Sequence, residues 1–388
     1  MLSQNERKRI IALINREVVP AIGCTEPIAV ALCTARAAEL LGSRPEKVAV
    51  RLSANILKNA MGVGIPGTGM IGLPIAVALG ALVGRSEYRL EVLRDVTPGA
   101  VEQGRRYIDE KRVCIDLKQG IAEKLYIEVE ARGAGHCATA VIAGGHTSFV
   151  YLERDGEVLR ELPVVDSAEE HRADKSLLNV ADILRFAAEV PLEDLLPLLE
   201  PQVSCNSAIA EEGLRGAWGA QIGRILLEDY GDDIKQRAKA YAAAGSDARM
   251  SGCEMPVVIL SGSGNQGITA CMPVVAYARH IGATREQLYR ALAVSDLVTV
   301  HQKTGIGRLS AYCGAISAGV GAGAGICYLL GGDYDAVAHT VVNAVAILSG
   351  TICDGAKSSC AAKIMSSVEA GIIGYQMYKQ NKEFAGGE

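Results

Sequence analysis

Three cysteines in the last quarter of the chain have types and spacing that could do chemistry. Cys353 and Cys360 lie seven residues apart in TICDGAKSSC, about two turns if that segment is helical, and Cys313 begins a glycine-rich segment. The three thiols could therefore converge where helices meet at glycines. Three thiolates would leave one iron of a 4Fe-4S cluster open, and an open iron can act as a Lewis acid toward a substrate.

Spacing alone does not separate a ligand from a core residue. Free cysteine is among the most buried residue types, and a core role is the commoner one. Arg308, Asp354 and Lys357 lie beside these cysteines in otherwise uncharged surroundings. A charge in such a setting needs a partner or a task, which favours a site. The chain has no C-x-x-C pair, so the usual zinc-ribbon, thioredoxin and ferredoxin spacings are absent.

A further cysteine, Cys24, lies in the segment GCTEP ahead of an expected helix that runs from Pro27 to about Leu41. Thr25 is the expected N-cap of that helix, and Pro27 suits its first turn. The helix dipole would then favour a thiolate at Cys24. The remaining cysteines lie in apolar patterns and are interpreted as core residues: Cys33, Cys114, Cys137, Cys205, Cys253, Cys271 and Cys327.

Two polar loops are candidates for substrate binding. SGSGNQG at residues 261–267 is typical of an anion site in which backbone N–H groups, hydroxyls and an amide converge, although such a loop is more often a tight turn. The second loop, GVGIPGTG, follows two amides and a lysine, and a solvated turn is about as plausible there. The candidate binding residues are Asn55, Lys58, Asn59, Ser261, Ser263, Gly264 and Asn265.

Composition excludes several classes of function. The 388 residues carry a net charge of -5 without a long run of either sign, so nucleic acid and anionic membranes are poor partners. The amino terminus has charges throughout its first apolar stretch, which predicts a cytoplasmic protein. Residues 59–84 and 309–332 are uncharged and long enough to span a membrane, but they are rich in glycine, so we expect buried, closely packed helices instead.

The elements that must position these residues change along the chain. Helical spacing covers residues 5–18 and 27–41. Short β-rich runs follow from residue 47, including YRLEVLRDV and KLYIEVEARG, with one helix near 98–111. From about residue 175 the pattern is helical.

This order predicts an α+β fold with a mainly α-helical catalytic domain and a smaller α+β domain. The expected division is residues 1–42 as N-terminal helices that pack on the helical domain, 43–170 as the α+β domain and 171–388 as an all-helical cluster-binding domain.

Five motifs together resemble the L-cysteine desulfidase family, which is related more distantly to the α portion of iron-sulfur L-serine dehydratases. The likeness runs over nearly the whole chain. The motifs are GCTEPIAVAL at 23–32, NILKNAMGVGIPGTG at 55–69, SGSGNQG at 261–267, RLSAYCG at 308–314 and TICDGAKSSC at 351–360.

The resemblance implies a 4Fe-4S enzyme that converts L-cysteine to pyruvate, ammonia and hydrogen sulfide. Cys313, Cys353 and Cys360 match the family's cluster ligands. Cys24 matches a further family cysteine, which is either the base that removes the α-proton or a reversible fourth ligand. A homo-oligomer, in the form of a dimer, is expected.

Two departures make water elimination from serine the weaker interpretation. The last two cluster cysteines of serine dehydratases lie farther apart than Cys353 and Cys360, and the tail KQNKEFAGGE has no cysteine. The alternatives are a serine dehydratase-like deaminase and a non-catalytic iron-sulfur redox sensor, which would hold a cluster without turnover.

Overall fold

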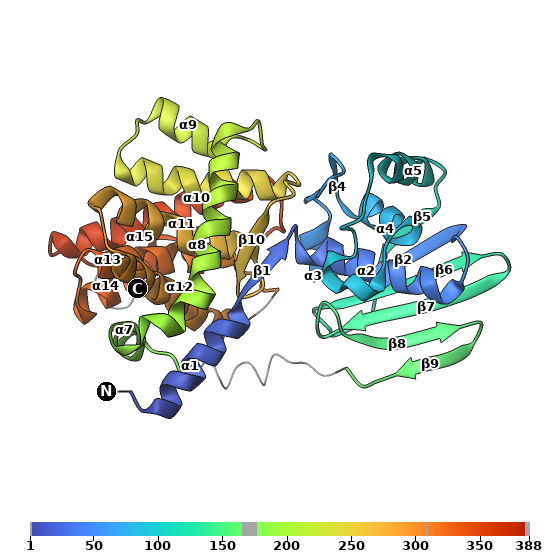
Figure 1. Ribbon diagram of the computed structural model, residues 1–388, viewed down its shortest axis with the longest axis horizontal. Helices are drawn as coiled ribbons and strands as arrows, with labels where there is room; N and C mark the ends of the chain where they lie inside the picture. Colours follow the sequence, from blue (N-terminus) through green and yellow to red (C-terminus); the bar gives the residue numbers. More distant parts are fainter. Residues whose placement is uncertain (1, 165–176, 308, 385–388) are drawn as a thin grey trace.

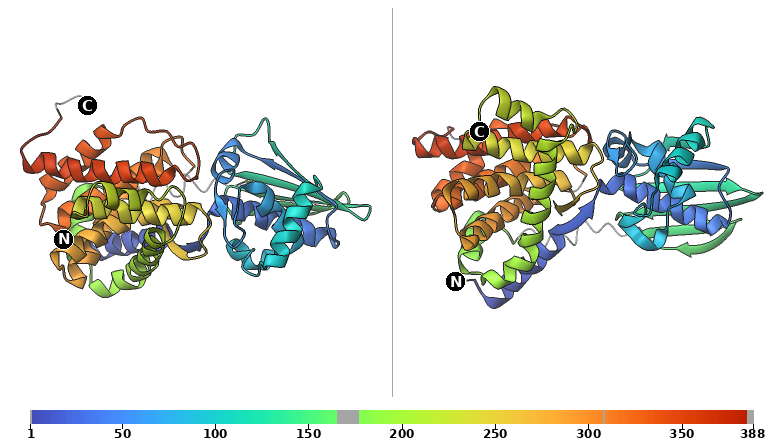
Figure 2. Two further views of the ribbon diagram at one scale, coloured as in Figure 1. Left: turned by 90° about the horizontal axis from the view of Figure 1, so that it is seen from above. Right: turned by 45° about the horizontal axis from the view of Figure 1, so that its top comes forward.

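Two lobes lie side by side along the long axis of the molecule in the computed structural model, which describes residues 2–164, 177–307 and 309–384 (Figure 1). One lobe is helical, and the other builds helices onto a six-stranded sheet. The two further views show the same separation (Figure 2). The predicted α+β class with a mainly helical domain is therefore confirmed.

The helical lobe takes its elements from both ends of the chain. Its strands β1 and β10 form a two-stranded antiparallel sheet. The elements are α1 (Gln4–Glu17), β1 (Val18–Ile22), α7 (Val180–Glu189), α8 (Leu192–Arg215), α9 (Ile222–Asp229), α10 (Ile234–Met250), β10 (Pro256–Leu260), α11 (Gly264–Ile281), α12 (Arg285–Ile306), α13 (Gly314–Leu329), α14 (Tyr334–Ile347) and α15 (Cys360–Lys379).

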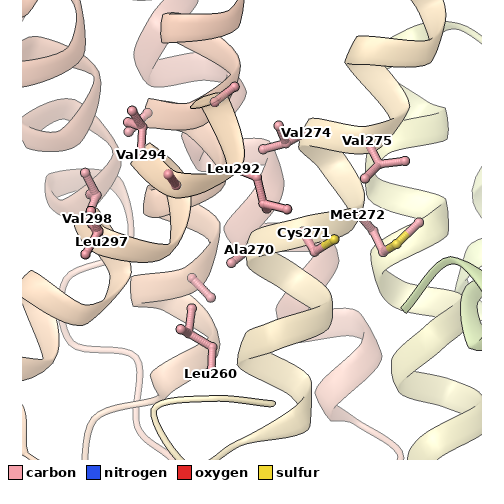
Figure 3. Close-up of a cluster of buried hydrophobic side chains, with 14 of the residues drawn as sticks. Leu260, Ala270, Cys271, Met272, Val274, Val275, Leu292, Val294, Leu297 and Val298 are labelled. Carbon is pink, nitrogen blue, oxygen red and sulfur yellow. The ribbon is translucent and has the colours of Figure 1, made fainter. Parts of the chain in front are cut away.

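Small and aliphatic side chains fill the centre of this lobe. Cys271 and its neighbours on α11 lie against residues of α12 such as Leu292, and Cys271 is fully buried (Figure 3). Glycines let α13 and α15 approach closely, since a Cβ on Gly323 would lie 2.6 Å from the Cα of Gly371. The long uncharged segment after Cys313 is thus a tightly packed helix of the lobe interior.

The α+β lobe has strand order β5-β2-β6-β7-β8-β9, in which the β2–β5 pair is parallel and the other pairs are antiparallel. Its elements are α2 (Thr25–Leu41), β2 (Lys47–Leu52), α3 (Ala54–Ala60), β3 (Gly64–Ile65), β4 (Met70–Ile71), α4 (Leu73–Leu82), the 3-10 helix η1 (Ser86–Glu91), α5 (Pro98–Asp109), β5 (Val113–Leu117), β6 (Tyr126–Gly133), β7 (His136–Ala143), β8 (Phe149–Arg154) and β9 (Glu157–Glu161).

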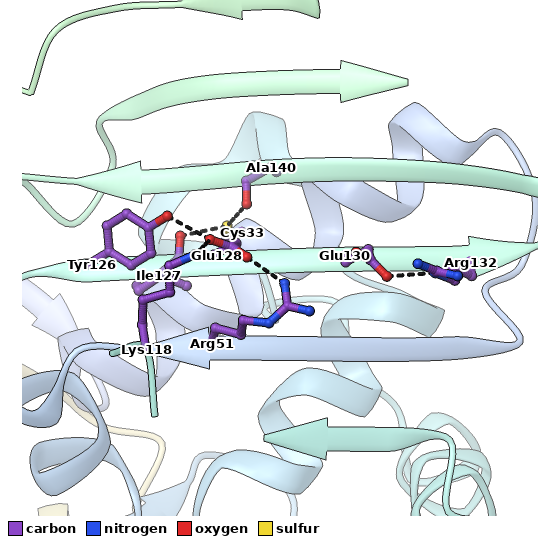
Figure 4. Close-up of polar contacts among 9 residues, drawn as sticks. All are labelled: Cys33, Arg51, Lys118, Tyr126, Ile127, Glu128, Glu130, Arg132 and Ala140. Carbon is purple, nitrogen blue, oxygen red and sulfur yellow. Dashed lines mark hydrogen bonds and ion pairs between the residues drawn. The ribbon is translucent and has the colours of Figure 1, made fainter. Parts of the chain in front are cut away.

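Helix α2 packs on the sheet, where Cys33 donates a hydrogen bond to the carbonyl of Ala140 at 3.3 Å. A polar network on the sheet centres on Glu128, which accepts from Arg51 at 2.5 Å and from Lys118 at 2.6 Å (Figure 4). These interactions pair the charges among themselves, so we interpret Cys33 and the network as structural.

The structure corrects the boundary expected near residue 42. Helix α1 and strand β1 contact α8 of the helical lobe, whereas α2 contacts α4 and the sheet. The chain therefore crosses between lobes at about Gly23, directly before Cys24. Helix α2 must lie there because it is buried on nearly every side and supplies much of the apolar surface beneath the sheet.

Four smaller expectations need correction. YRLEVLRDV, residues 88–96, covers the end of η1 and the turn after it instead of a strand, because Arg89 has φ +51, which interrupts an extended conformation. The N-cap of α2 is Cys24, and Thr25 is its first residue. The expected all-helical part contains β10. Cys114 is exposed and Cys137 is partly exposed, so these two are not core residues, whereas the partly exposed Cys205 packs against the core of the helical lobe.

Among the described residues, no helix is both long and apolar enough to cross a membrane.

Candidate functional site

Cys313 and Cys353 lie on two adjacent segments of the helical lobe. The Cys313 N–H donates to the Thr351 carbonyl at 3.1 Å, and the Cys353 N–H donates to the Ala311 carbonyl at 2.7 Å. A bridge between Tyr312 and Ile352 completes the antiparallel pairing. This local ladder brings together two cysteines that are far apart in the sequence.

The two thiols are close enough to interact. Their interaction lowers the pKa of Cys353 and raises the pKa of Cys313. The positive charges of Lys58 and Lys363 lower the pKa of Cys353 further. The surroundings thus favour a thiolate at Cys353.

Cys360 is the first residue of α15 and adjoins the same cysteines. Its thiol donates to the carbonyl of Gly355 at 3.6 Å. Burial raises the pKa of Cys360, and the charge of Cys353 contributes in the same direction. Asp354 pairs with Lys357 at 2.9 Å and also with Lys363. The charges noted in the sequence therefore pair with each other, and Arg308 lies outside the described residues.

Cys24 reaches this group from the lobe boundary. It caps α2, is 5% exposed and packs with Met250, Val63 and Cys360. Burial raises the pKa of its thiol to about 12, against the smaller opposing effect of the Arg249 charge. The expected lowering of this pKa by the helix dipole is therefore wrong, since desolvation of the thiolate outweighs it.

A carboxylate that sequence reasoning missed lies beside Cys24. Glu26 is buried, and its Oε2 accepts from the Cys24 thiol at 3.5 Å and from the Thr25 hydroxyl at 3.1 Å. Its Oε1 accepts from the Asn59 amide at 3.2 Å. The position of Glu26 within GCTEP, at the first turn of α2, was the available signal.

A buried arginine, also missed, faces Cys24 from the other lobe. Arg249 on α10 is 3% exposed and donates to the Gly23 carbonyl at 3.1 Å and to the Asn265 side-chain oxygen at 3.2 Å. Gly264 is required here, because a Cβ would collide with the guanidinium. A charge within the small-residue run AAAGSDARMSG was the signal that could have revealed Arg249.

The other predicted binding residues lie on α3 and on the turn before α11. Lys58 donates to the Ser310 carbonyl at 3.4 Å and so lies with the cysteines, while Asn55 is half-buried on α3. Ser263 is the N-cap of α11 without a side-chain capping bond. Ser261 is buried with φ +48, a strained conformation for a residue other than glycine.

Four helices begin at this site. Their first residues are Thr25 of α2, Gly264 of α11, Gly314 of α13 and Cys360 of α15. The side chain of Gln266 on α11 lies against Gly314, which joins the ends of α11 and α13. Cys360 packs against the small cluster that contains Cys24, which joins the ends of α15 and α2. Helix N-termini carry unpaired N–H groups and partial positive charge, so the site favours anions.

The site spans the two lobes. Gly355 of the helical lobe has φ +100 and approaches the Lys58 carbonyl so closely that a Cβ would collide with it. Within the described ranges, no three His, Cys, Asp or Glu side chains are grouped to hold a single metal ion. A cavity of about 440 Å³ lies elsewhere in the α+β lobe, beside Arg89 and Arg160, and its lining contains none of the predicted site residues.

A comparison with known families identifies the family of this chain. Residues 87–386 match the serine dehydratase alpha chain family, and the chain belongs to that family. The predicted relation to the α portion of serine dehydratases is thereby confirmed.

Several bacterial proteins are similar to this chain over nearly its whole length. A UPF0597 protein of Bacteroides thetaiotaomicron is 52% identical over 385 residues, which covers 98% of this chain and 89% of that protein. One from Bacteroides fragilis is 51% identical over 386 residues, with coverage of 98% and 90%. One from Desulfitobacterium hafniense is 49% identical over 378 residues, with coverage of 97% and 87%.

Proposed function

We propose that this protein is an iron-sulfur L-cysteine desulfidase, which converts L-cysteine to pyruvate, ammonia and hydrogen sulfide. The observation that carries the proposal is the grouping of Cys313, Cys353 and Cys360 with Cys24 at the lobe boundary. Membership of the serine dehydratase alpha chain family supports a lyase that eliminates a substituent from a small amino acid.

The donor set fits a 4Fe-4S cluster. Each of several thiolates can bind a separate iron, so the ligands surround a shared space instead of converging on one ion. Cys313, Cys353 and Cys360 are all free thiols whose charges influence one another, and Lys58 and Lys363 add positive charge beside them. When bound, the cluster would supply an open iron as a Lewis acid toward the sulfur of the substrate.

The residues of the chain itself would bind the substrate and move its protons. The candidates for holding the carboxylate and amine are Ser261, Ser263, Gly264, Asn265, Asn55, Lys58 and Asn59. Cys24 would remove the α-proton, after which the electron pair on Cα expels sulfide from Cβ. The released aminoacrylate hydrolyses to pyruvate and ammonia.

Glu26 would assist Cys24 in this proposal. Its Oε2 accepts a hydrogen bond from the Cys24 thiol at 3.5 Å, so Glu26 would orient that thiol. Burial and, to a smaller extent, the same hydrogen bond raise the pKa of Cys24, so the thiol must lose its proton before it can act as the base. The alternative role for Cys24, a reversible fourth ligand, predicts that its removal alters the absorption of the cluster.

Competition between two substrates tests the proposal. Anaerobically reconstituted protein is given equal concentrations of L-cysteine and L-serine, and sulfide and pyruvate are measured together. We expect sulfide and pyruvate in equal amounts. Pyruvate without sulfide would support the second candidate, a serine dehydratase, which the family match favours. A cluster spectrum with neither product would support the redox sensor and contradict both enzymes.

A further inference from the structure

Arg249 is a buried charge without a countercharge. It is 3% exposed, and in the described parts of the chain no carboxylate forms an ion pair with it. Its two hydrogen bonds go to neutral oxygens, those of Gly23 and Asn265. A buried guanidinium is costly unless an anion compensates it, so this position calls for a negatively charged ligand.

Two unused hydrogen-bond donors lie on Arg249 and on the turn that precedes α11. The Nε–H of Arg249 is buried and has no partner among the described residues. The hydroxyl of Ser261, three residues before the start of α11, is also buried without a described partner. Buried polar groups are nearly always satisfied, and both of these groups can donate to an anion.

The N-terminus of α11 adds a second positive feature at this point. Gly264, the first residue of α11, lies against the guanidinium, so the free N–H groups of the first turn and the charge of Arg249 are adjacent. Two positive features side by side are stabilised by an anion between them. Guanidinium N–H groups match the two oxygens of a carboxylate in particular.

We propose that Arg249 and the first turn of α11 bind the α-carboxylate of the amino-acid substrate. This inference rests on the proposed function and names a binding residue of the same site. Arg249 also holds the Gly23 carbonyl next to Cys24, so a carboxylate bound there lies beside the thiol that would act at Cα.

The test compares two ligands on each protein. L-Alanine has the carboxylate and amine but no leaving group, and L-alaninamide lacks the negative charge. Titration calorimetry on the anaerobically reconstituted protein gives both dissociation constants, and we expect the wild type to prefer L-alanine by about tenfold or more. The ratio of the two constants does not depend on the fraction of protein that is folded.

Two variants and a control distinguish the hydrogen bonds of the Arg249 guanidinium from its positive charge. Arg249→Lys keeps the charge but loses the fork of N–H groups, and Gly264→Ala displaces the guanidinium without removing it. Both should lose most of the preference. Gly99→Ala on α5, where the nearest side-chain atom to a Cβ lies 3.9 Å away, should keep it. Thermal melts by circular dichroism report folding, and if Arg249→Lys unfolds, Gly264→Ala carries the test.

Two results would overturn the inference. One is equal binding of both ligands, or no binding of L-alanine at millimolar concentration, by the wild type. The other is an unchanged preference in folded Arg249→Lys and Gly264→Ala. A protein that binds L-alanine through Arg249 but releases no sulfide would contradict the proposed function and leave the carboxylate site standing.

Discussion

Cys353 is the cysteine whose surroundings most clearly favour a metal-binding thiolate, because the neighbouring Cys313 thiol and the charges of two lysines lower its pKa. Cys353→Ser should therefore lose iron after reconstitution and release no sulfide. Iron and sulfide are measured on the purified variant. The matched control is Cys114→Ser, an exposed cysteine on β5, which should keep both. A Cys353→Ser variant with about four irons and full activity would refute the ligand assignment.

Cys24 has a different expected role. Cys24→Ala should keep the iron and the absorption of the cluster but lose sulfide release by about a hundredfold or more, since loss of a general base typically costs that much. Visible absorption and sulfide are measured on the same sample. Full activity would rule out the base, and a changed spectrum would identify Cys24 as a ligand.

Among the individual site residues, the sequence indicated the cysteines but not the charged residues that lie beside Cys24. Cys313, Cys353, Cys360 and Cys24 stood in motifs that can be read directly. Arg249 could not be placed, because its role depends on how the end of α10 packs against the start of α2 in the other lobe. The pKa of Cys24 was misjudged for a related reason, since burial cannot be read from one segment.

Among the elements, α13 follows its N-cap Cys313 and α15 begins at Cys360, so the spacing of these two helices should control the proposed cluster site. A Cβ at Gly323 would lie 2.8 Å from the carbonyl oxygen of Gly371, and the helices would have to move apart. Gly323→Ala should lower the free energy of unfolding by about 1–3 kcal/mol and reduce iron content. Chemical denaturation and iron analysis check both effects.

The control for this change is Gly305→Ala on α12, where a Cβ would meet no atom within 4 Å. Alanine is favoured over glycine in helices, so this variant should be as stable as the wild type or more so. Equal destabilisation of the two variants would contradict the packing argument.

Between α8 and α12, Asp296 gives a stability term that depends on pH. Burial raises its pKa to about 7, and Gln202 donates to it at 3.1 Å. The native state therefore binds more protons than the unfolded state between about pH 4 and pH 7. The free energy of unfolding therefore falls as the pH rises through that window, because a rising pH favours the unfolded state, in which the carboxyl of Asp296 is already ionised. Above the native pKa, the native state bears the full cost of a buried, charged carboxylate.

Asp296→Asn should remove that dependence. We expect the variant to gain stability relative to the wild type, by an amount that grows from pH 5 to pH 8 and reaches on the order of 2–4 kcal/mol. Urea denaturation at several pH values measures it. A difference between the two proteins that stays constant with pH would show that Asp296 does not titrate in this range.

Strong periodicity predicted the elements well, and tertiary contacts account for the misses. The expected helices at 5–18, 27–41 and 98–111 correspond to α1, α2 and α5. YRLEVLRDV alternates like a strand, but Leu90 packs against the core of the α+β lobe from the 3-10 helix η1, and Leu93 does so from the turn that follows it. The short strands β1 and β10 pair only because distant segments meet, so the pattern of β1 alone could not reveal the pair, although VVIL within β10 has a strand-like apolar pattern.

For the whole molecule, the main consequence is that the site belongs to neither lobe alone. The α+β lobe contributes Cys24, Glu26 and Lys58. The helical lobe contributes Arg249 and the three proposed cluster ligands, Cys313, Cys353 and Cys360. The division expected from the sequence placed the boundary after residue 42, which would have hidden the fact that Cys24 lies at the crossing. The expected homodimer stays a prediction that a mass measurement in solution tests.

The most direct test of the central claim is the yield of sulfide and pyruvate from L-cysteine before and after anaerobic reconstitution with iron and sulfide. Reconstitution should load about four irons per chain, and the two products should then appear in equal amounts and only in the loaded protein. Inorganic sulfide must be removed before the assay. Loaded protein that releases neither product, or unloaded protein that releases both, would contradict the account.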